Sequence, residues 1–305
     1  MKLAFFNDFQ LGTVTGDSVT DVSAAVSDVP RTGPHDLIAN LIATFDTYRA
    51  RLEAAAAQGP ALPLASVRLR PPLPRPANIV CMAVNYMEDG TRAEPAPINA
   101  FQKASTTVIG PGDTMILPDM GATIFEGEAE LALVIGKAAH NVPAASAMEH
   151  VFGYVCFIDG SARGVPAFYQ MKSRATFAPI GPWIVTADEI PDPQKLQVRL
   201  SNNGTLMQNF NTDDMAHNIP RCIEWVTSVH RLLPGDILAT GTNHRGLHAF
   251  QDGDRIELEI ERVGKLGISV RDHLRRTWSR ETRLQRTGKT PETAPQLSGK
   301  YAERR

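Results

Sequence analysis

The sequence contains little cysteine: only Cys81, Cys156 and Cys222 occur among its 305 residues, and they lie far apart. An odd number of widely spaced cysteines predicts neither a disulfide framework nor a zinc site, but buried free thiols in a reducing compartment. No apolar run approaches the roughly 18 residues of a membrane span, and the run of four before Asn7 is too short for a signal peptide. We therefore expect a soluble, cytoplasmic protein that does not associate with a membrane.

An excess of charge of one sign is also nearly absent, because 31 basic residues face 33 acidic residues and leave a formal net charge of −2. Such a balance argues against a polyanion such as nucleic acid as a partner of the main body. Residues 274–305 differ, with nine basic residues against three glutamates and little apolar periodicity. We expect this segment to form a basic arm that is extended or disordered, or that crosses to a neighbouring subunit.

The first 75 residues predict a small N-terminal α/β domain with a proline-rich linker. Residues 1–28 alternate short apolar runs with turn residues, which indicates a small antiparallel sheet. Residues 36–57 carry apolar side chains at spacings of three and four after Pro34, which predicts an amphipathic helix. Six prolines between positions 60 and 76 cannot continue a helix or enter a central strand, so we place the domain boundary there.

Residues 76–273 predict a mostly β domain of the α+β class, with a mixed or antiparallel sheet and few helices. Helices are expected at 144–151 and 219–232, and Asn203-Gly204 indicates a type I′ hairpin. Short β-type runs, separated by turn residues, occur at 79–84, 107–110, 114–117, 128–135, 183–186, 198–209, 237–240, 256–260 and 266–270.

Three glutamates alternate directly before one of these apolar runs. Residues two apart in a strand share a face, so Glu126, Glu128 and Glu130 would lie close together. Like charges at that spacing require a counter-ion, and a hard divalent cation with oxygen ligands supplies one. A solvated acidic face is the alternative, but the continuous apolar run at 131–135 suits a strand buried on both faces.

Four further segments carry polar side chains at strand ends and turns, where functional sites are often built. Taken alone, each has an ordinary explanation as a capped strand or a solvated turn. The residues concerned are Tyr86, Glu88 and Asp89 after the strand at 79–84; Asp159 and Arg163 around a Gly-Ser-Ala turn; Lys172; and Thr242, Asn243 and His244 after Gly241.

Together and in this order, the five segments resemble the fumarylacetoacetate hydrolase family over residues 78–272. The resemblance implies a mixed β-roll or distorted barrel in a homodimer, acting in the catabolism of aromatic compounds. It implies that Glu128, Glu130 and Asp159 bind Mg²⁺ or Mn²⁺, with Ca²⁺ as an alternative. Lys172 matches the catalytic lysine of the family, and the loop at 240–242 matches its Thr-Gly-Thr loop.

The residue types suit the chemistry of such enzymes, whose substrates are 1,3-diketones and 2-oxo acids. Adjacent substrate oxygens chelate a cation, and a carboxylate-bound metal polarises the carbonyl and stabilises an enolate. Lys172 and Arg163 would add fixed positive charge near a developing oxyanion or a substrate carboxylate. The candidate substrate-binding residues are Arg163, Tyr86, Thr242 and Asn243.

The sequence departs from the family in the segment that activates water. Hydrolytic members carry Asn-Tyr-x-x-His-x-x-Glu, whereas this chain has Asp89 in place of the histidine and Arg92 in place of the glutamate. Pro166 stands where the family has glutamine, and Asn243 where it has proline. A carboxylate with a raised pKa, Asp89 or Glu88, could serve as the base, or an imidazole could come from His244 or His248 in another loop.

The sequence therefore predicts a divalent-metal-dependent hydrolase that cleaves a carbon–carbon bond in an acylpyruvate-type substrate. Because enolisation and decarboxylation need no water, an isomerase, hydratase or decarboxylase acting on a 2-oxo acid is the alternative. A binding protein that retains the fold and the metal but has lost turnover is a third possibility. The lysine beside the predicted ligands argues against it, because a binder has less use for groups that stabilise an enolate.

Overall fold

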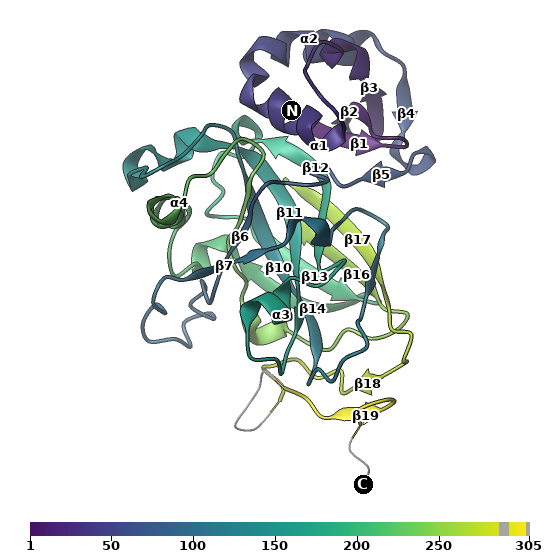
Figure 1. Cartoon of the computed structure of the whole chain (residues 1–305), viewed down its shortest axis with the longest axis vertical. Coiled ribbons are helices and arrows are strands. Elements are labelled where there is room, and N and C mark those ends of the chain that lie inside the picture. The colour runs from purple at the N-terminus through teal and green to yellow at the C-terminus, as the bar shows by residue number, and fades with distance from the viewer. Residues whose placement is uncertain (287–292, 303–305) are drawn as a thin grey trace.

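The computed structural model describes residues 1–286 and 293–302, and these are organised mainly as β-sheet (Figure 1). The largest sheet has twelve strands in the order β4-β3-β2-β1-β12-β11-β10-β15-β6-β7, with β5 beside β1 and β8 beside β12. A second sheet has the order β14-β13-β16-β17-β9, and β18 pairs with β19. The mostly β fold with a few helices is confirmed. No helix in the described ranges is long and apolar enough to span a membrane.

The strands of the large sheet are β1 (Lys2–Phe6), β2 (Gln10–Thr15), β3 (Ser18–Asp21), β4 (Ala61–Pro63), β5 (Leu69–Arg70), β6 (Ile79–Met82), β7 (Ala100–Lys103), β8 (Val108–Ile109), β10 (Phe125–Ile135), β11 (Val151–Ala162), β12 (Ala178–Thr186) and β15 (Ile237–Ala239). The remaining strands are β9 (Thr114–Ile116), β13 (Gln197–Asn202), β14 (Thr205–Asn211), β16 (Arg255–Ile260), β17 (Gly264–Arg271), β18 (Thr277–Trp278) and β19 (Gln296–Ser298).

The α-helices are α1 (Pro34–Ala43), α2 (Phe45–Gln58), α3 (Phe168–Lys172) and α4 (Ile219–Val229). Short 3₁₀ turns are η1 (Ser23–Val26), η2 (Leu64–Ser66), η3 (Ser105–Thr107), η4 (Ala144–His150), η5 (Ala187–Glu189), η6 (Thr212–Asp214) and η7 (His244–Gly246). The helix expected at 144–151 is therefore a 3₁₀ helix, and the one expected at 219–232 ends three residues early.

The N-terminal residues form the expected antiparallel sheet, which joins the large sheet where β1 pairs with β12, Leu3 lying opposite Ile184. The single helix expected at 36–57 is interrupted at Thr44, whose φ of −124° leaves the helical region. There the Thr44 hydroxyl donates to the Asn40 carbonyl at 2.8 Å and stabilises the end of α1. A separate domain ending at residue 75 stays a prediction.

Two local predictions from the sequence are confirmed. Asn203 and Gly204 have φ angles of 51° and 80°, the left-handed pair of a type I′ turn, and they connect β13 to β14. The cysteines are all free and buried. The sequence thus predicted these features because each depends on local backbone preference or on burial of an apolar group.

The described part of the basic arm packs on its own chain. Arg276 is fully buried, and its guanidinium donates to Asp272 and to the carbonyls of Pro118 and Met120. Residues 287–292 and 303–305 of the arm lie outside the described residues. An arm that crosses to a second subunit stays a prediction.

Strands β10 and β11 lie side by side in the middle of the large sheet (Figure 1). The acidic residues Glu126, Glu128 and Glu130 lie on β10, and Asp159 lies on β11. All eleven residues of β10 are buried. Leu131 and Leu133 face one apolar core, whereas Ala132 and Val134 face another, so the strand is covered on both sides, as predicted. Glutamates within such a strand are removed from solvent and need partners inside the protein.

Candidate active site

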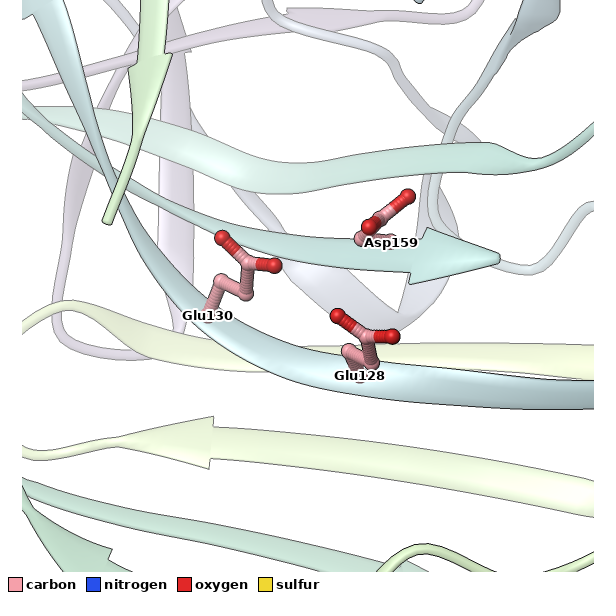
Figure 2. Close-up of side chains that lie close together, drawn as sticks. All are labelled: Glu128, Glu130 and Asp159. Atoms are coloured by element: carbon pink, nitrogen blue, oxygen red, sulfur yellow. The ribbon is translucent and has the colours of Figure 1, made fainter. Parts of the chain in front are cut away.

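Glu128, Glu130 and Asp159 lie close together on two neighbouring strands (Figure 2). Glu128 is directly opposite Asp159 in the antiparallel register of β10 and β11, and Glu130 is two residues further along the same face. One carboxylate oxygen from each residue lies within 4.8 Å of the others, and all three side chains are buried. The strand alternation seen in the sequence therefore brings three carboxylates to one point.

Two buried lysines offset part of the negative charge of this cluster. Lys172 Nζ donates to Glu128 Oε1 at 2.8 Å and also to Asp159. Lys103 Nζ donates to Asp159 Oδ1 at 2.5 Å and to the Gly160 carbonyl at 3.0 Å. Lys172 was predicted from the sequence, whereas Lys103 was not, because a single lysine at the end of a short strand is usually solvated. Only the pairing of β7 with β6 carries Lys103 to the cluster.

Glu130 has an oxygen that no described residue satisfies. Its Oε2 accepts a hydrogen bond from the Gly241 backbone at 2.7 Å, but its Oε1 is buried and has no hydrogen-bond partner in residues 1–286 or 293–302. Burial, together with the charges of Asp159 and Glu128, raises the pKa of Glu130 well above its ordinary value. A buried oxygen without a donor beside two more carboxylates fits a hard divalent cation, which takes oxygen ligands.

Glu126 is surrounded by arginines. Arg163 Nε lies 3.0 Å from Glu126 Oε2, Arg283 Nη2 lies 2.7 Å from the same oxygen, and Arg286 Nη2 lies 3.4 Å from Oε1. Burial alone would raise the pKa of Glu126, but Arg283 and Arg163 outweigh it and lower this pKa. The alternative of a solvated acidic face is therefore wrong for Glu126, because its side chain is fully buried. Arg163 also donates to Glu128, so it joins the two glutamates.

The segment that departs from the family brings a carboxylate to a histidine from a distant loop. His244 Nδ1 lies 2.6 Å from Glu88 Oε1, and the His244 backbone N–H donates to Glu88 Oε2 at 3.0 Å. Burial favours the neutral form of Glu88, but the contact with His244 outweighs it and lowers the pKa of Glu88. Gly241, three residues before His244 in the same loop, donates its backbone N–H to Glu130 Oε2 at 2.7 Å, so this loop borders the acidic cluster.

The other candidate bases have different surroundings. Asp89 is 48% exposed at its side chain and pairs with Arg245 at 2.7 Å. His248 is buried, 3.0 Å from the Asn202 amide, and burial lowers its pKa to about 4. Of the candidates named from the sequence, the structure thus joins Glu88 to His244 and gives Asp89 and His248 separate partners.

The candidate substrate-binding residues are mostly engaged in internal hydrogen bonds. Thr242 Oγ1 accepts from the Gln208 amide at 2.9 Å, and the Asn243 amide donates to Asp214 at 3.2 Å. Tyr86 is fully buried against Phe210, with 5.0 Å between ring centroids. Its hydroxyl has no hydrogen-bond partner within the described part of the chain. Their role in binding substrate stays a prediction.

The fold and this constellation together identify the family. The family model described as fumarylacetoacetate (FAA) hydrolase C-terminal matches residues 78–271. The chain belongs to the fumarylacetoacetate hydrolase family and is an enzyme of that family.

Its relatives include enzymes with different reactions. The chain is 35% identical over 291 residues to maleylpyruvate hydrolase of Aquipseudomonas alcaligenes, covering 89% of this chain and 99% of that protein. It is 34% identical over 270 residues to the mitochondrial oxaloacetate tautomerase FAHD2B of Bos taurus, covering 82% of each. The crystal structure of maleylpyruvate hydrolase from Sphingobium sp. SYK-6, in complex with manganese(II) ion and pyruvate, matches with a TM-score of 0.82 and 37% identity, covering 89% of this chain and 99% of that one.

Proposed function

We propose that this protein is a divalent-metal-dependent hydrolase that cleaves a carbon–carbon bond in an acylpyruvate-type 2-oxo acid. The observation that carries the proposal is the 2.6 Å contact between His244 Nδ1 and Glu88 Oε1. A histidine oriented by a carboxylate is suited to activate water, and this pair stands in for the one missing from residues 85–92. The similarity to maleylpyruvate hydrolase supports the same class of reaction.

The metal site of the proposal consists of Glu128, Glu130 and Asp159, which would hold Mg²⁺ or Mn²⁺. When bound, such an ion polarises the neighbouring oxygens of a 2-oxo acid and stabilises the enolate left by bond cleavage. Lys172 keeps its positive charge beside these carboxylates, where it favours negative charge on the substrate. The manganese(II) ion in the Sphingobium relative supports a divalent ion of this kind.

The proton steps are assigned to His244 and Glu88. His244 Nε2, which makes no hydrogen bond to residues 1–286 or 293–302, accepts a proton from water while Glu88 holds Nδ1–H and stabilises the imidazolium. The hydroxide formed adds to the acyl carbonyl carbon, and the bond from that carbon to the adjacent methylene breaks. Its electron pair remains on the methylene carbon, which takes up the proton that His244 accepted, so that His244 returns to its neutral form and the products are pyruvate and a carboxylic acid.

Keto–enol tautomerisation is the second candidate function. The 34% identity to oxaloacetate tautomerase favours it, because that relative covers 82% of this chain. Tautomerisation requires only that a proton move between carbon and oxygen. It therefore needs no water, and the Glu88–His244 pair would not have to activate one.

An assay of the purified protein with Mn²⁺ or Mg²⁺ separates these functions. Acylpyruvates and oxaloacetate are supplied while diketone absorbance, pyruvate, the released acid and CO₂ are followed. Equal amounts of pyruvate and carboxylic acid support the hydrolase. Enol–keto exchange without pyruvate supports the tautomerase, and CO₂ supports a decarboxylase; either result refutes the proposed reaction.

A further inference from the structure

Two short stretches of backbone carry the Glu88–His244 pair, and neither belongs to a strand or an α-helix. Glu88, Asp89 and Gly90 have φ angles of 58°, 53° and 76°, so three consecutive residues adopt the left-handed region. This conformation is costly for the two residues that carry a side chain, so contacts from elsewhere have to stabilise it. His244 begins η7, a 3₁₀ turn of three residues. The geometry of the pair therefore depends on the groups that hold these two stretches.

Asp214 holds the turn that carries Glu88. The Asp89 backbone N–H donates to the Asp214 carboxylate, at 3.2 Å from Oδ1 and 3.1 Å from Oδ2. The Met87 N–H donates to the Asp214 carbonyl at 2.9 Å. A hydrogen bond from a backbone N–H to a carboxylate is charge-assisted and stronger than a neutral one. Asp214 therefore fixes the backbone at the residue before Glu88 and at the residue after it.

Asn243 connects the same carboxylate to the turn that carries His244. Its Nδ2 donates to Asp214 Oδ2 at 3.2 Å, and its Oδ1 accepts from the Arg245 backbone N–H at 3.1 Å, which caps η7. The side chain is 3% exposed. These partners require a donor on one side and an acceptor on the other, which an amide supplies and a carboxylate does not. Asn243 stands where the family has proline, which offers neither group.

We infer that Asp214 and Asn243 form a bridge that positions the Glu88–His244 pair, so that both are positioning residues for the reaction. The inference rests on the proposed function, which assigns the proton steps to that pair. Because the imidazole comes from residue 244 and not from residue 89, it has to be held against a carboxylate on another loop. The bridge joins these two loops directly beside the contact between imidazole and carboxylate.

Separate contacts hold the loop of His244 to β10. The buried Gln208 amide donates to Thr242 Oγ1 and to the Asn243 carbonyl, both at 2.9 Å. Its Oε1 accepts from the Ala129 N–H at 3.1 Å, on β10 between two of the predicted metal ligands. Loss of the bridge should therefore disturb the contact between His244 and its carboxylate while the metal site stays intact.

Exchanging the two side chains tests the bridge. Asn243→Asp places a second carboxylate 3.2 Å from the first, so we expect kcat to fall by about 10- to 100-fold with little change in KM. Asp214→Asn keeps one oxygen for the two donors and should lower kcat less. The double variant Asp214→Asn/Asn243→Asp again places a donor against an acceptor, so its kcat should exceed that of Asn243→Asp by about tenfold or more.

Asp213→Asn is the matched control, because Asp213 is the adjacent carboxylate and is exposed, and it should leave kcat unchanged. A double variant no more active than Asn243→Asp would overturn the bridge. So would a Mn²⁺ affinity, measured by calorimetry, that falls in parallel with kcat, because the effect would then belong to the metal site.

A measurement without turnover separates this inference from the proposed function. In Mg²⁺-loaded protein with ¹⁵N-labelled histidine, the Nδ1–H of His244 that faces Glu88 gives a downfield proton resonance, assigned by its absence in His244→Asn. Loss of this resonance in Asn243→Asp and its return in the double variant support the bridge even if no acylpyruvate is hydrolysed, a result that would refute only the proposed reaction. Its persistence in Asn243→Asp refutes the bridge, whatever the turnover. If Asn243→Asp does not fold, Asn243→Ala, which removes both contacts without adding charge, is measured in its place.

Discussion

Replacing Glu88 with glutamine removes the negative charge that faces His244 but keeps an oxygen able to accept the hydrogen bond from Nδ1, now 2.6 Å from Glu88 Oε1. The loss matters most in the transition state, where the imidazole gains a proton. A hydrogen bond to a charged group contributes about 1–2 kcal/mol more than a neutral one, which corresponds to a decrease in kcat of about 5- to 30-fold. We expect this decrease with little change in KM.

The assay is steady-state acylpyruvate hydrolysis with Mn²⁺, with pyruvate measured by coupling to lactate dehydrogenase. His244→Asn should lower kcat by about 100- to 10,000-fold, the usual range for loss of a general base. The double variant should resemble His244→Asn alone, because the two residues act as a unit. Asp89→Asn is the matched control, since Asp89 is the adjacent carboxylate, is 48% exposed and pairs with Arg245 instead. A larger decrease for Asp89→Asn than for Glu88→Gln would refute the pairing as the source of the base.

Three further predictions concern the metal, the loop and pH. Glu128→Gln should weaken Mn²⁺ binding at least tenfold by calorimetry, while Glu126→Gln, whose carboxylate contacts arginines instead, should retain it. Gly241→Ala should lower the free energy of unfolding by about 1–2 kcal/mol in urea. Its φ is +89° and an added Cβ would lie 3.0 Å from the Asn85 Cβ; an unchanged midpoint would contradict this strain. Burial lowers the pKa of His248 from 6.5 to about 4. As pH falls, His248 is therefore protonated at a higher pH in the unfolded chain than in the folded protein. Stability should therefore fall as pH falls from 6.5 to about 4, and His248→Gln should flatten this slope, which urea titrations at several pH values would measure.

Much of the acidic site was predictable from the sequence because strand geometry is local. Residues two apart in a strand share a face, so the spacing of Glu126, Glu128 and Glu130 was enough to place them in one row. The apolar residues that follow indicated burial on both sides, and two cores cover β10. The family resemblance then supplied Asp159, which lies on the neighbouring strand and could not be joined to Glu128 by spacing alone.

The partners of Glu126 could not be predicted from the local sequence pattern. Its position in the row is equivalent to that of Glu128, yet its partners are Arg163, Arg283 and Arg286, two of them from the C-terminal arm. The sequence indicated only that the arm is basic. Which carboxylate receives these charges depends on how the arm returns to the loop at 244–247, and that path follows from packing.

The residue types of the site, their order along the chain and the face of β10 on which the glutamates lie all follow from local sequence pattern. In contrast, long-range packing joins Glu88 to His244, which are 156 residues apart, and brings Lys103 to Asp159. Backbone periodicity sets directions over only a few residues. Contacts between distant segments are fixed by the pairing of strands and by the need of each buried charge for a partner.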